Sequence, residues 1–296
     1  SPDRLVEDYW PEFRVEGKSS CTVRQLLEHR AGVPFVPPGC KLRDLLDWEK
    51  LIDLIAAQSP TWEPGATLAE HAITYGHLCS ALVHRTTGES LGTFFQREVA
   101  TRLGADLHFG LPANQLPCCA ELSAWPEDTL TELREMTGFS EKGLFQPDAL
   151  LFQPGVMNSE AWRKAEIPAV NLHGTARCVA QVYATLAAGG ELEGVRLLSP
   201  DTVALLRTPC GEAERDAVFG FAARWTLGFQ HNEWDDDGGG AGRFGLGGIG
   251  GSSAFGSFDH GGVSYAYLTR QMGSWERTEL VERALRDVLL RLDRAE

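Results

Sequence analysis

Apolar residues recur at steps of three and four positions through much of the first 210 residues, which is the spacing of one face of an α-helix. Between positions 41 and 58, six leucines and isoleucines follow this spacing. Between positions 70 and 87, the spacing places Tyr75 on an apolar face with Ala72, Cys79 and Leu82. The pattern therefore predicts helices over both stretches. Three further helices are predicted over residues 91–103, 175–188 and 200–206.

Local capping signals predict where several of these helices begin and end. Thr22-Val-Arg-Gln25 is a capping-box pattern that starts a short helix, and Gly32 is predicted to close it. Residues 112–168 lack a clear period and are predicted as long loops with one or two short helices. The other predicted start and stop residues are Ser90, Ser199, Gly88 and Gly104.

The pattern changes after Pro209. Extended segments are predicted over residues 219–229, 252–258 and 263–269, the last of which is rich in aromatic and β-branched residues. An amphipathic helix is predicted over residues 275–295. A helical region followed by an antiparallel sheet and a covering helix is an α+β arrangement. We expect one domain over residues 1–296, with a mostly helical region at about 14–210 and the sheet strands and terminal helix at 211–296.

Charge and hydropathy narrow the class of protein. The 27 basic and 41 acidic residues give a net charge of −14 at pH 7, which disfavours nucleic acid as a partner. The longest apolar stretches, such as residues 51–57, are too short to span a bilayer. No membrane span is therefore expected. No cofactor is predicted either.

The cysteines and the first residue bear on the compartment. Seven cysteines include no CxxC pair, so we expect reduced thiols, which favours a cytoplasmic or organelle-interior location. The chain begins at Ser1 without an initiator methionine or an apolar signal segment. We therefore expect a fragment, a processed chain or an expression product of a longer sequence.

Two glycine motifs match patterns that carry chemistry in other proteins. Gly88-Glu-Ser-Leu-Gly92 matches the nucleophile elbow GxSxG, which needs a strand-to-helix turn to expose its serine. Here the motif lies between two predicted helices, so Ser90 is predicted to cap a helix, and an α/β-hydrolase that uses Ser90 is a weaker alternative. Residues 245–250 match GxGxxG, but no helix is predicted after them to receive a phosphate. These glycines predict close backbone approach at a sheet edge that lines a cleft.

Histidines and aspartates could in principle hold a metal ion. His71, His77 and His84 share one predicted helix, but no HExxH pattern accompanies them. Asp235 to Asp237 form an acidic run that is typical of a solvated loop. No metal site is therefore predicted.

Several segments together resemble the β-lactamase-related serine hydrolases, the group of penicillin-recognising enzymes and low-activity esterases. The resemblance runs from about residue 5 to about residue 290 and rests on the joint order of its segments. These segments are Glu7-Asp-Tyr-Trp-Pro-Glu-Phe13, Thr22-Val-Arg-Gln-Leu-Leu-Glu-His-Arg-Ala-Gly-Val-Pro34, Trp62-Glu-Pro-Gly65, Arg85-Thr-Thr-Gly88, residues 102–112, Gly174-Thr-Ala-Arg177, residues 183–190 and Leu197-Leu-Ser-Pro200.

The resemblance implies a β-lactamase/transpeptidase-like fold and acyl transfer at a serine that a lysine one helical turn later activates. No serine among the 296 residues is followed three positions later by lysine. In the family, that helix precedes the segment that resembles residues 5–13, so the chain is expected to lack it together with the first strands. The cleft-lining strand motif, Lys or His followed by x-Gly, aligns with Leu246-Gly247-Gly248, and leucine cannot carry charge.

The remaining candidate residues are ambiguous. The family's catalytic tyrosine aligns with Glu70, which could be an acid or base or, alternatively, an exposed carboxylate at a helix start. Tyr75 is a nearby catalytic candidate, but its spacing also fits core packing. His260 could replace a missing base from a loop between two strands.

Two hypotheses follow. In the first, the chain is a catalytically impaired β-lactamase-like domain, a binding or scaffold module with a possible fusion or partner domain. In the second, it is the C-terminal portion of an active serine hydrolase that acts on small esters or amides. The missing strands would also leave a sheet edge exposed, which predicts marginal stability or self-association.

Overall fold

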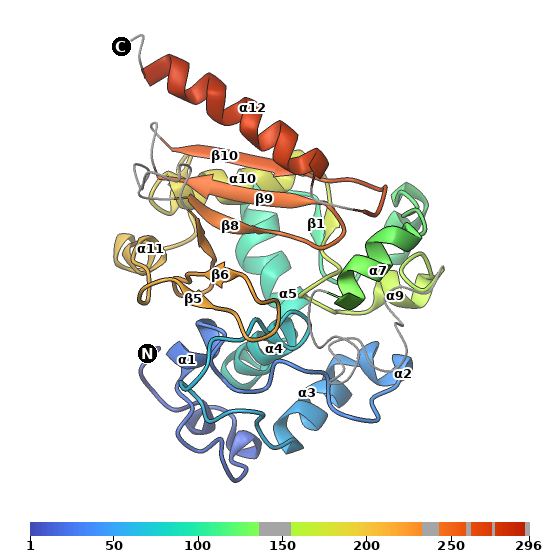
Figure 1. The fold of residues 1–296 in the computed structure, drawn as a ribbon, viewed down its shortest axis with the longest axis vertical. Helices are drawn as coiled ribbons and strands as arrows, with labels where there is room; N and C mark the ends of the chain where they lie inside the picture. The colour runs from blue at the N-terminus through green and yellow to red at the C-terminus, as the bar shows by residue number, and fades with distance from the viewer. Residues whose placement is uncertain (136–154, 233–242, 259–261, 274–275, 294–296) are drawn as a thin grey trace.

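The structure, a computed structural model, describes residues 1–135, 155–232, 243–258, 262–273 and 276–293. A helical region holds the N-terminal half, and an antiparallel sheet with one helix on each face lies above it (Figure 1). The fold is therefore α+β, as the sequence predicted. No helix in these ranges is long and apolar enough to cross a membrane.

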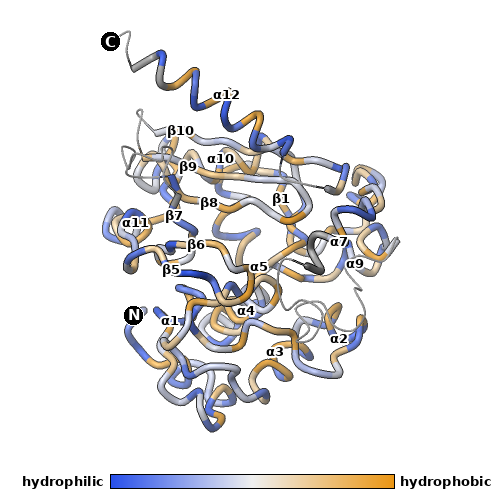
Figure 2. The backbone as a smooth tube through the Cα atoms, in the orientation of Figure 1, coloured by the Kyte–Doolittle hydropathy of each residue, from blue (hydrophilic) through white to orange (hydrophobic). Residues whose placement is uncertain are grey.

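Short helices and turns build the helical region. Those up to residue 87 pack around a cluster of buried residues that includes Trp10, Phe13, Leu26, Leu51 and Ile55, and Figure 2 shows apolar residues in orange along α3 (Trp48–Ala57). The helices at residues 91–103 contribute to a second cluster. The helices up to residue 135 are η1 (Val6–Asp8), η2 (Pro11–Phe13), α1 (Val23–Leu27), α2 (Leu42–Leu45), α3 (Trp48–Ala57), α4 (Thr74–Thr87), α5 (Leu91–Phe95), η3 (Gln96–Ala100), α6 (Thr101–Leu103), η4 (Ala113–Cys118) and α7 (Glu127–Glu135).

Further helices precede the terminal one among the described residues of the second half, and all strands except β1 also lie there. The helices are α9 (Glu160–Lys164), α10 (Ala176–Ala187) and α11 (Pro200–Arg207). Three two-stranded ribbons pair β1 (Leu107–His108) with β2 (His173–Gly174), β3 (Glu191–Leu192) with β4 (Val195–Arg196), and β5 (Glu214–Arg215) with β6 (Ala222–Ala223).

The main sheet has the order β10-β9-β8-β7, and every pair in it is antiparallel. Its strands are β7 (His231–Asn232), β8 (Arg243–Gly247), β9 (Ser253–Ser257) and β10 (Val263–Tyr267), followed by α12 (Glu276–Asp293). Among the described strands β10 pairs on one side alone. Self-association through that edge stays a prediction.

The register of the sheet shows which helix covers which face. Arg243 pairs with Ser257 and Gly247 with Ser253, so these residues share one face, and Phe244 lies on the other. Glu282 of α12 accepts hydrogen bonds from Arg243 and Ser253. On the opposite face, Phe244 contacts α10. The sheet therefore lies between α12 and α10.

Local capping explains the confirmed helix starts. The side chain of Thr22 accepts from the backbone N–H of Gln25 in a full capping box. Ser90 and Ser199 also cap the helices that follow them, as predicted. Gly88 and Gly104 end their helices with φ angles of 78° and 62°.

Several predicted boundaries are wrong. The helix predicted over residues 41–58 is divided at Asp47, which caps α3 through the N–H of Lys50. The helix expected from residue 70 begins at Thr74. α1 ends well before Gly32, and His29 takes the left-handed conformation there. The segment predicted as extended over residues 219–229 contains only the short strand β6.

The interface between α12 and the sheet is polar at its centre. The carboxylate of Glu282 lies 2.5 Å from the Arg243 guanidinium and 2.6 Å from Oγ of Ser253. Ser253 also lies 2.6 Å from Oγ1 of Thr278, and both side chains are buried. In contrast, Leu280, Val281 and Val288 of the same helix are exposed. Hydrogen bonds, more than apolar burial, thus hold α12.

Replacing Glu282 with glutamine should lower the free energy of unfolding by about 1–3 kcal/mol, because the hydrogen bonds to this partly buried carboxylate lose their charge assistance. Urea denaturation followed by circular dichroism measures the change. The matched control is Glu279→Gln on the exposed side of the same helix, which should change stability by less than about 0.5 kcal/mol. Equal effects of the two variants would contradict the importance of this contact.

Candidate functional site

Glu70 lies in an extended segment that leads into α4, and its side chain is only 9% exposed. The backbone of this segment is fixed by distant residues: the N–H of Ala69 donates to the carbonyl of His29, and the N–H of Glu70 donates to Oδ2 of Asp216 at 2.6 Å. The alternative of an exposed carboxylate at a helix start is therefore wrong.

The environment of Glu70 favours its protonated form. Burial, and then the nearby negative charge of Asp216, raise the pKa of Glu70 to about 8. Asp216 accepts backbone N–H groups from Val218 at 2.8 Å and Phe219 at 2.7 Å as well as from Glu70. Burial raises the pKa of Asp216 too, but these three donors stabilise its anion. We therefore assign the proton to Glu70 and the negative charge to Asp216 at neutral pH.

Tyr75 lies in a buried cluster of rings near Glu70. Its ring stacks on His29 at 4.3 Å, and His29 lies 3.9 Å from the ring of Trp225. Burial raises the pKa of Tyr75 well above its ordinary value, and a hydrogen bond with Cys79 acts in the same direction. A phenol in this environment keeps its proton, so core packing accounts for Tyr75, and a catalytic role for it stays a hypothesis.

His71 is held in one tautomer beside this cluster. Its Nδ1–H donates to the carbonyl of Ala69 at 2.6 Å, and its Nε2 accepts from the N–H of Val33 at 3.2 Å. Burial lowers the pKa of His71 to about 4 and that of His29 well below its ordinary value. Both imidazoles are therefore neutral at pH 7 and act as hydrogen-bonding parts of the core.

The cleft-lining motif lies on β8 and the turn that follows it. Leu246 pairs with Ala254 of β9, and its side chain is 39% exposed. Gly247 ends the strand, and the N–H of Gly248 donates to the carbonyl of Ser252 at 2.7 Å. Ile249 at the tip of this turn packs against the helical core, which also includes Tyr75. The turn thus joins the sheet to the helical region.

The two glycine motifs adopt the structures that their context predicted. A nucleophile elbow is excluded for Ser90, because it lies between two helices and its Oγ donates to Glu166 at 2.7 Å. Residues 245–250 form the end of β8 and a hairpin turn, with no helix after them. A Cβ on Gly245 would lie 2.3 Å from the Ala254 carbonyl, so close approach requires glycine there. β8, however, is an inner strand.

The metal candidates do not form a ligand set. His71 precedes α4, while His77 and His84 lie within it. The part of the chain that the structure describes contains no group of three or more metal-ligating side chains. His260 and the Asp235–Asp237 run lie outside the described residues.

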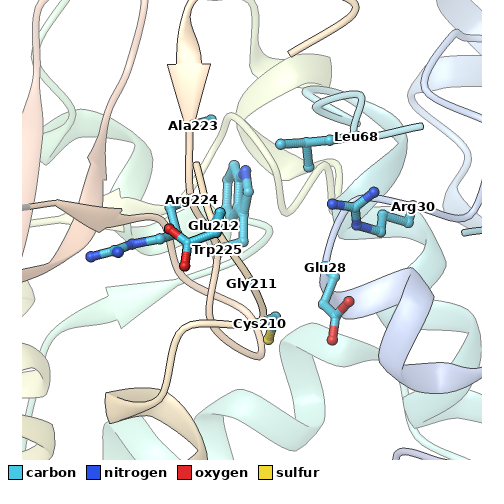
Figure 3. Close-up of a pocket in the computed structure, with 9 residues that line it drawn as sticks. All are labelled: Glu28, Arg30, Leu68, Cys210, Gly211, Glu212, Ala223, Arg224 and Trp225. Carbon is cyan, nitrogen blue, oxygen red and sulfur yellow. The ribbon is translucent and has the colours of Figure 1, made fainter. Parts of the chain in front are cut away.

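A small pocket opens between the helical region and the segment before β7 (Figure 3). One wall comes from the end of α1 and the segment before α4, and the other from residues 210–212 and 223–225. Figure 3 shows Trp225 on the second wall, with Leu68, Arg30 and Glu28 on the other side of the pocket. The lining residues are Glu28, Arg30, Leu68, Cys210, Gly211, Glu212, Ala223, Arg224 and Trp225.

Sequence reasoning missed two residues that organise this region. Asp216 fixes the position of Glu70 from 146 residues away, and its local signal was an Asx turn, in which Asp accepts the N–H groups two and three residues later. Asn171 is 3% exposed and bonds three backbone groups of residues 162–167. No pattern in its neighbours marked it.

The α+β fold, with a helical region beside an antiparallel sheet, is shared with solved structures of carboxylesterases and penicillin-binding-protein homologues, which sets the class of protein. A family model described as Beta-lactamase matches residues 1–289. The chain therefore belongs to the β-lactamase family.

The amino-acid sequence is similar to that of a curated relative over about two thirds of the chain. The Esterase/beta-lactamase LipL of Mycobacterium tuberculosis is 33% identical over 208 residues, which are 67% of this chain. These residues are 47% of LipL, so the chain spans about half the length of that relative.

Two solved structures are also similar. A family VIII carboxylesterase has 34% identity and a TM-score of 0.80, covering 93% of this chain and 72% of its own. A penicillin-binding protein homologue from Caulobacter crescentus has 32% identity and a TM-score of 0.78, covering 92% of this chain and 71% of its own.

Proposed function

We propose that this chain is a single β-lactamase-related domain that binds small esters or amides and is catalytically impaired as a serine hydrolase. The observation that carries the proposal is Leu246. It stands on β8 at the position where the family resemblance implies lysine or histidine, and an alkyl side chain supplies neither charge nor a hydrogen bond.

The serines of the chain support the same conclusion. None of the 296 residues completes a Ser-x-x-Lys pair. The hydroxyls of Ser90 and Ser253 donate to the carboxylates of Glu166 and Glu282. Ser90 is further fixed as a helix cap, and Ser253 is buried under α12. Neither hydroxyl has a neutral base and an open approach for an acyl group.

The ligand class is proposed from the names of the relatives, which include an esterase/β-lactamase and a carboxylesterase. The alternative is that the chain is the C-terminal portion of an active serine esterase. The 34% identity to the carboxylesterase favours this alternative, which requires a Ser-x-x-Lys helix from sequence beyond these residues.

A fluorophosphonate probe tests whether this chain itself carries a reactive serine. The alternative would instead be supported by an adduct that forms only on a longer chain with an added Ser-x-x-Lys helix. We expect intact-mass spectrometry to show no adduct after incubation, and p-nitrophenyl butyrate to hydrolyse no faster than with the Ser90→Ala variant. Binding is measured separately by calorimetry with N-phenylbutyramide, an ester analogue that resists hydrolysis. A stoichiometric adduct, mapped to one serine, would overturn the impairment, and absence of any heat of binding would overturn the ligand class.

A further inference from the structure

The turn between β5 and β6 anchors an otherwise exposed hairpin to the helical region. Residues 211–215 and 220–222 are exposed, whereas Asp216 is 1% exposed. Val218 and Phe219 belong to the same buried cluster as the N-terminal helices. Residues 216–219 are thus the part of this hairpin that the core holds.

Two backbone hydrogen bonds join this turn to the segment before α4. The N–H of Glu70 donates to Oδ2 of Asp216 at 2.6 Å, and the N–H of Ala217 donates to the carbonyl of Leu68 at 2.9 Å. An ion pair between Arg30 and Glu214 lies beside them. We call this contact, which joins residues 68–70 to residues 216–217, the carboxyl latch.

The carboxyl latch contains two buried acids and no buried base that neutralises them. Asp216 is the charge that acts on Glu70, and its own anion is held by backbone donors. A second negative charge on Glu70 would therefore face Asp216 in a region shielded from water. The titratable groups on the surrounding segments are Glu28, His29, Arg30, His71, Tyr75, Glu214 and Arg215.

Most of these groups cannot offset that charge. His29 and His71 are neutral at pH 7, and Tyr75 keeps its proton. Arg30 is already paired with Glu214.

We propose that Glu70 and Asp216 form a proton-dependent latch, which holds the β5–β6 hairpin on the helical region while Glu70 is protonated. When Glu70 loses its proton, repulsion from Asp216 favours release of the 216–219 turn. The pocket in Figure 3 has one wall on each side of this contact, so release would widen it. This inference is independent of the ligand class proposed above.

The direction of the pH dependence follows from where the proton is bound. With the latch closed the pKa of Glu70 is about 8, and in the open, solvated state it returns to its ordinary 4.5. The closed state therefore binds more protons, and its advantage is complete below pH 4.5 and decreases as the pH rises to 8. Opening is expected to increase roughly tenfold per pH unit between pH 5 and 8 and to level off above that. Asp216, with its pKa also raised, contributes in the same direction at lower pH.

Hydrogen exchange measured by mass spectrometry tests the latch. After correction for the intrinsic rate, protection of residues 214–223 should fall about a hundredfold from pH 5.5 to 7.5 in the unmodified chain. In Glu70→Gln, which cannot ionise, protection should stay constant. Glu63→Gln, at an exposed position seven residues earlier, should behave like the unmodified chain. Protection of α10 (Ala176–Ala187) should be unchanged in all three, which separates local release from global unfolding.

A pH-dependent loss of protection that persists in Glu70→Gln would overturn the proposal, as would constant protection in the unmodified chain. A second measurement applies if the variant does not fold. In the unmodified chain labelled with ¹³C at glutamate carboxyls, one carboxyl should titrate near pH 8. Titration of every glutamate below pH 6 would also overturn the proposal.

Discussion

Replacing Phe244 with alanine should lower the free energy of unfolding by about 3–5 kcal/mol, because it opens a cavity where the sheet meets α10. Phe244 is 1% exposed, and its ring lies 4.6 Å from Phe258, 5.4 Å from Phe229 and 5.9 Å from Tyr183. Gly256 has no room for a Cβ beside it, since that atom would lie 2.5 Å from Phe244 Cζ. The packing is close, and the sheet backbone restricts collapse around the lost ring.

Urea denaturation followed by tryptophan fluorescence measures this loss. Phe221→Ala is the matched control, because Phe221 is 38% exposed and stacks on Phe219 alone among the described rings. We expect the control to cost less than about 1 kcal/mol. A loss below 1 kcal/mol for Phe244→Ala would mean that α10 does not depend on this contact.

The second large effect is expected at Asn171. Its Nδ2 donates to the carbonyls of Trp162 at 3.0 Å and Ala165 at 2.8 Å, and its Oδ1 accepts from the N–H of Ile167 at 3.0 Å. Asn171→Ala leaves these three backbone groups without their partner in a buried site, which should cost about 2–4 kcal/mol. The midpoint of thermal unfolding and the urea midpoint should both fall.

Two further variants test this prediction: one is a control at an exposed asparagine, and the other removes the donors of Asn171 alone. Asn114→Ala, at an exposed position, should leave both midpoints unchanged. Asn171→Asp keeps the acceptor for Ile167 and loses both donors, so its stability should be no greater than that of the alanine variant at pH 7. Stability of Asn171→Ala equal to that of the unmodified chain would show that water replaces all three bonds.

Features that depend on neighbouring residues could be predicted from the sequence. The caps at Thr22, Ser90 and Ser199 are confirmed because each side chain bonds an N–H three residues later. The helix at Ala176–Ala187 and the terminal helix were predicted from apolar spacing, and both are present. The α+β fold followed from the change of pattern after Pro209.

Features that depend on distant residues could not be predicted in this way. The helical period continues back to residue 70, yet Glu70 and Ala69 bond with Asp216 and His29, so α4 begins only at Thr74. The burial of Glu70 beside Asp216, which raises the pKa of Glu70 to about 8, has no signal in either local sequence. The family resemblance indicated Glu70 as a candidate residue, but its protonation state depends on the contacts that the fold creates.

The two helices that cover the sheet are attached by different kinds of contact, and this difference affects how the protein unfolds. α10 packs on one face of the sheet through aromatic contacts around Phe244, whereas α12 depends on the charge-assisted hydrogen bonds of Glu282 on the other face. Salt screens ionic contacts, although a partly buried pair such as Arg243 and Glu282 is screened less than a surface pair, and it leaves hydrophobic burial intact. Raised ionic strength would therefore loosen the C-terminal helix as a separate cooperative unit, while the other side of the sheet stays native.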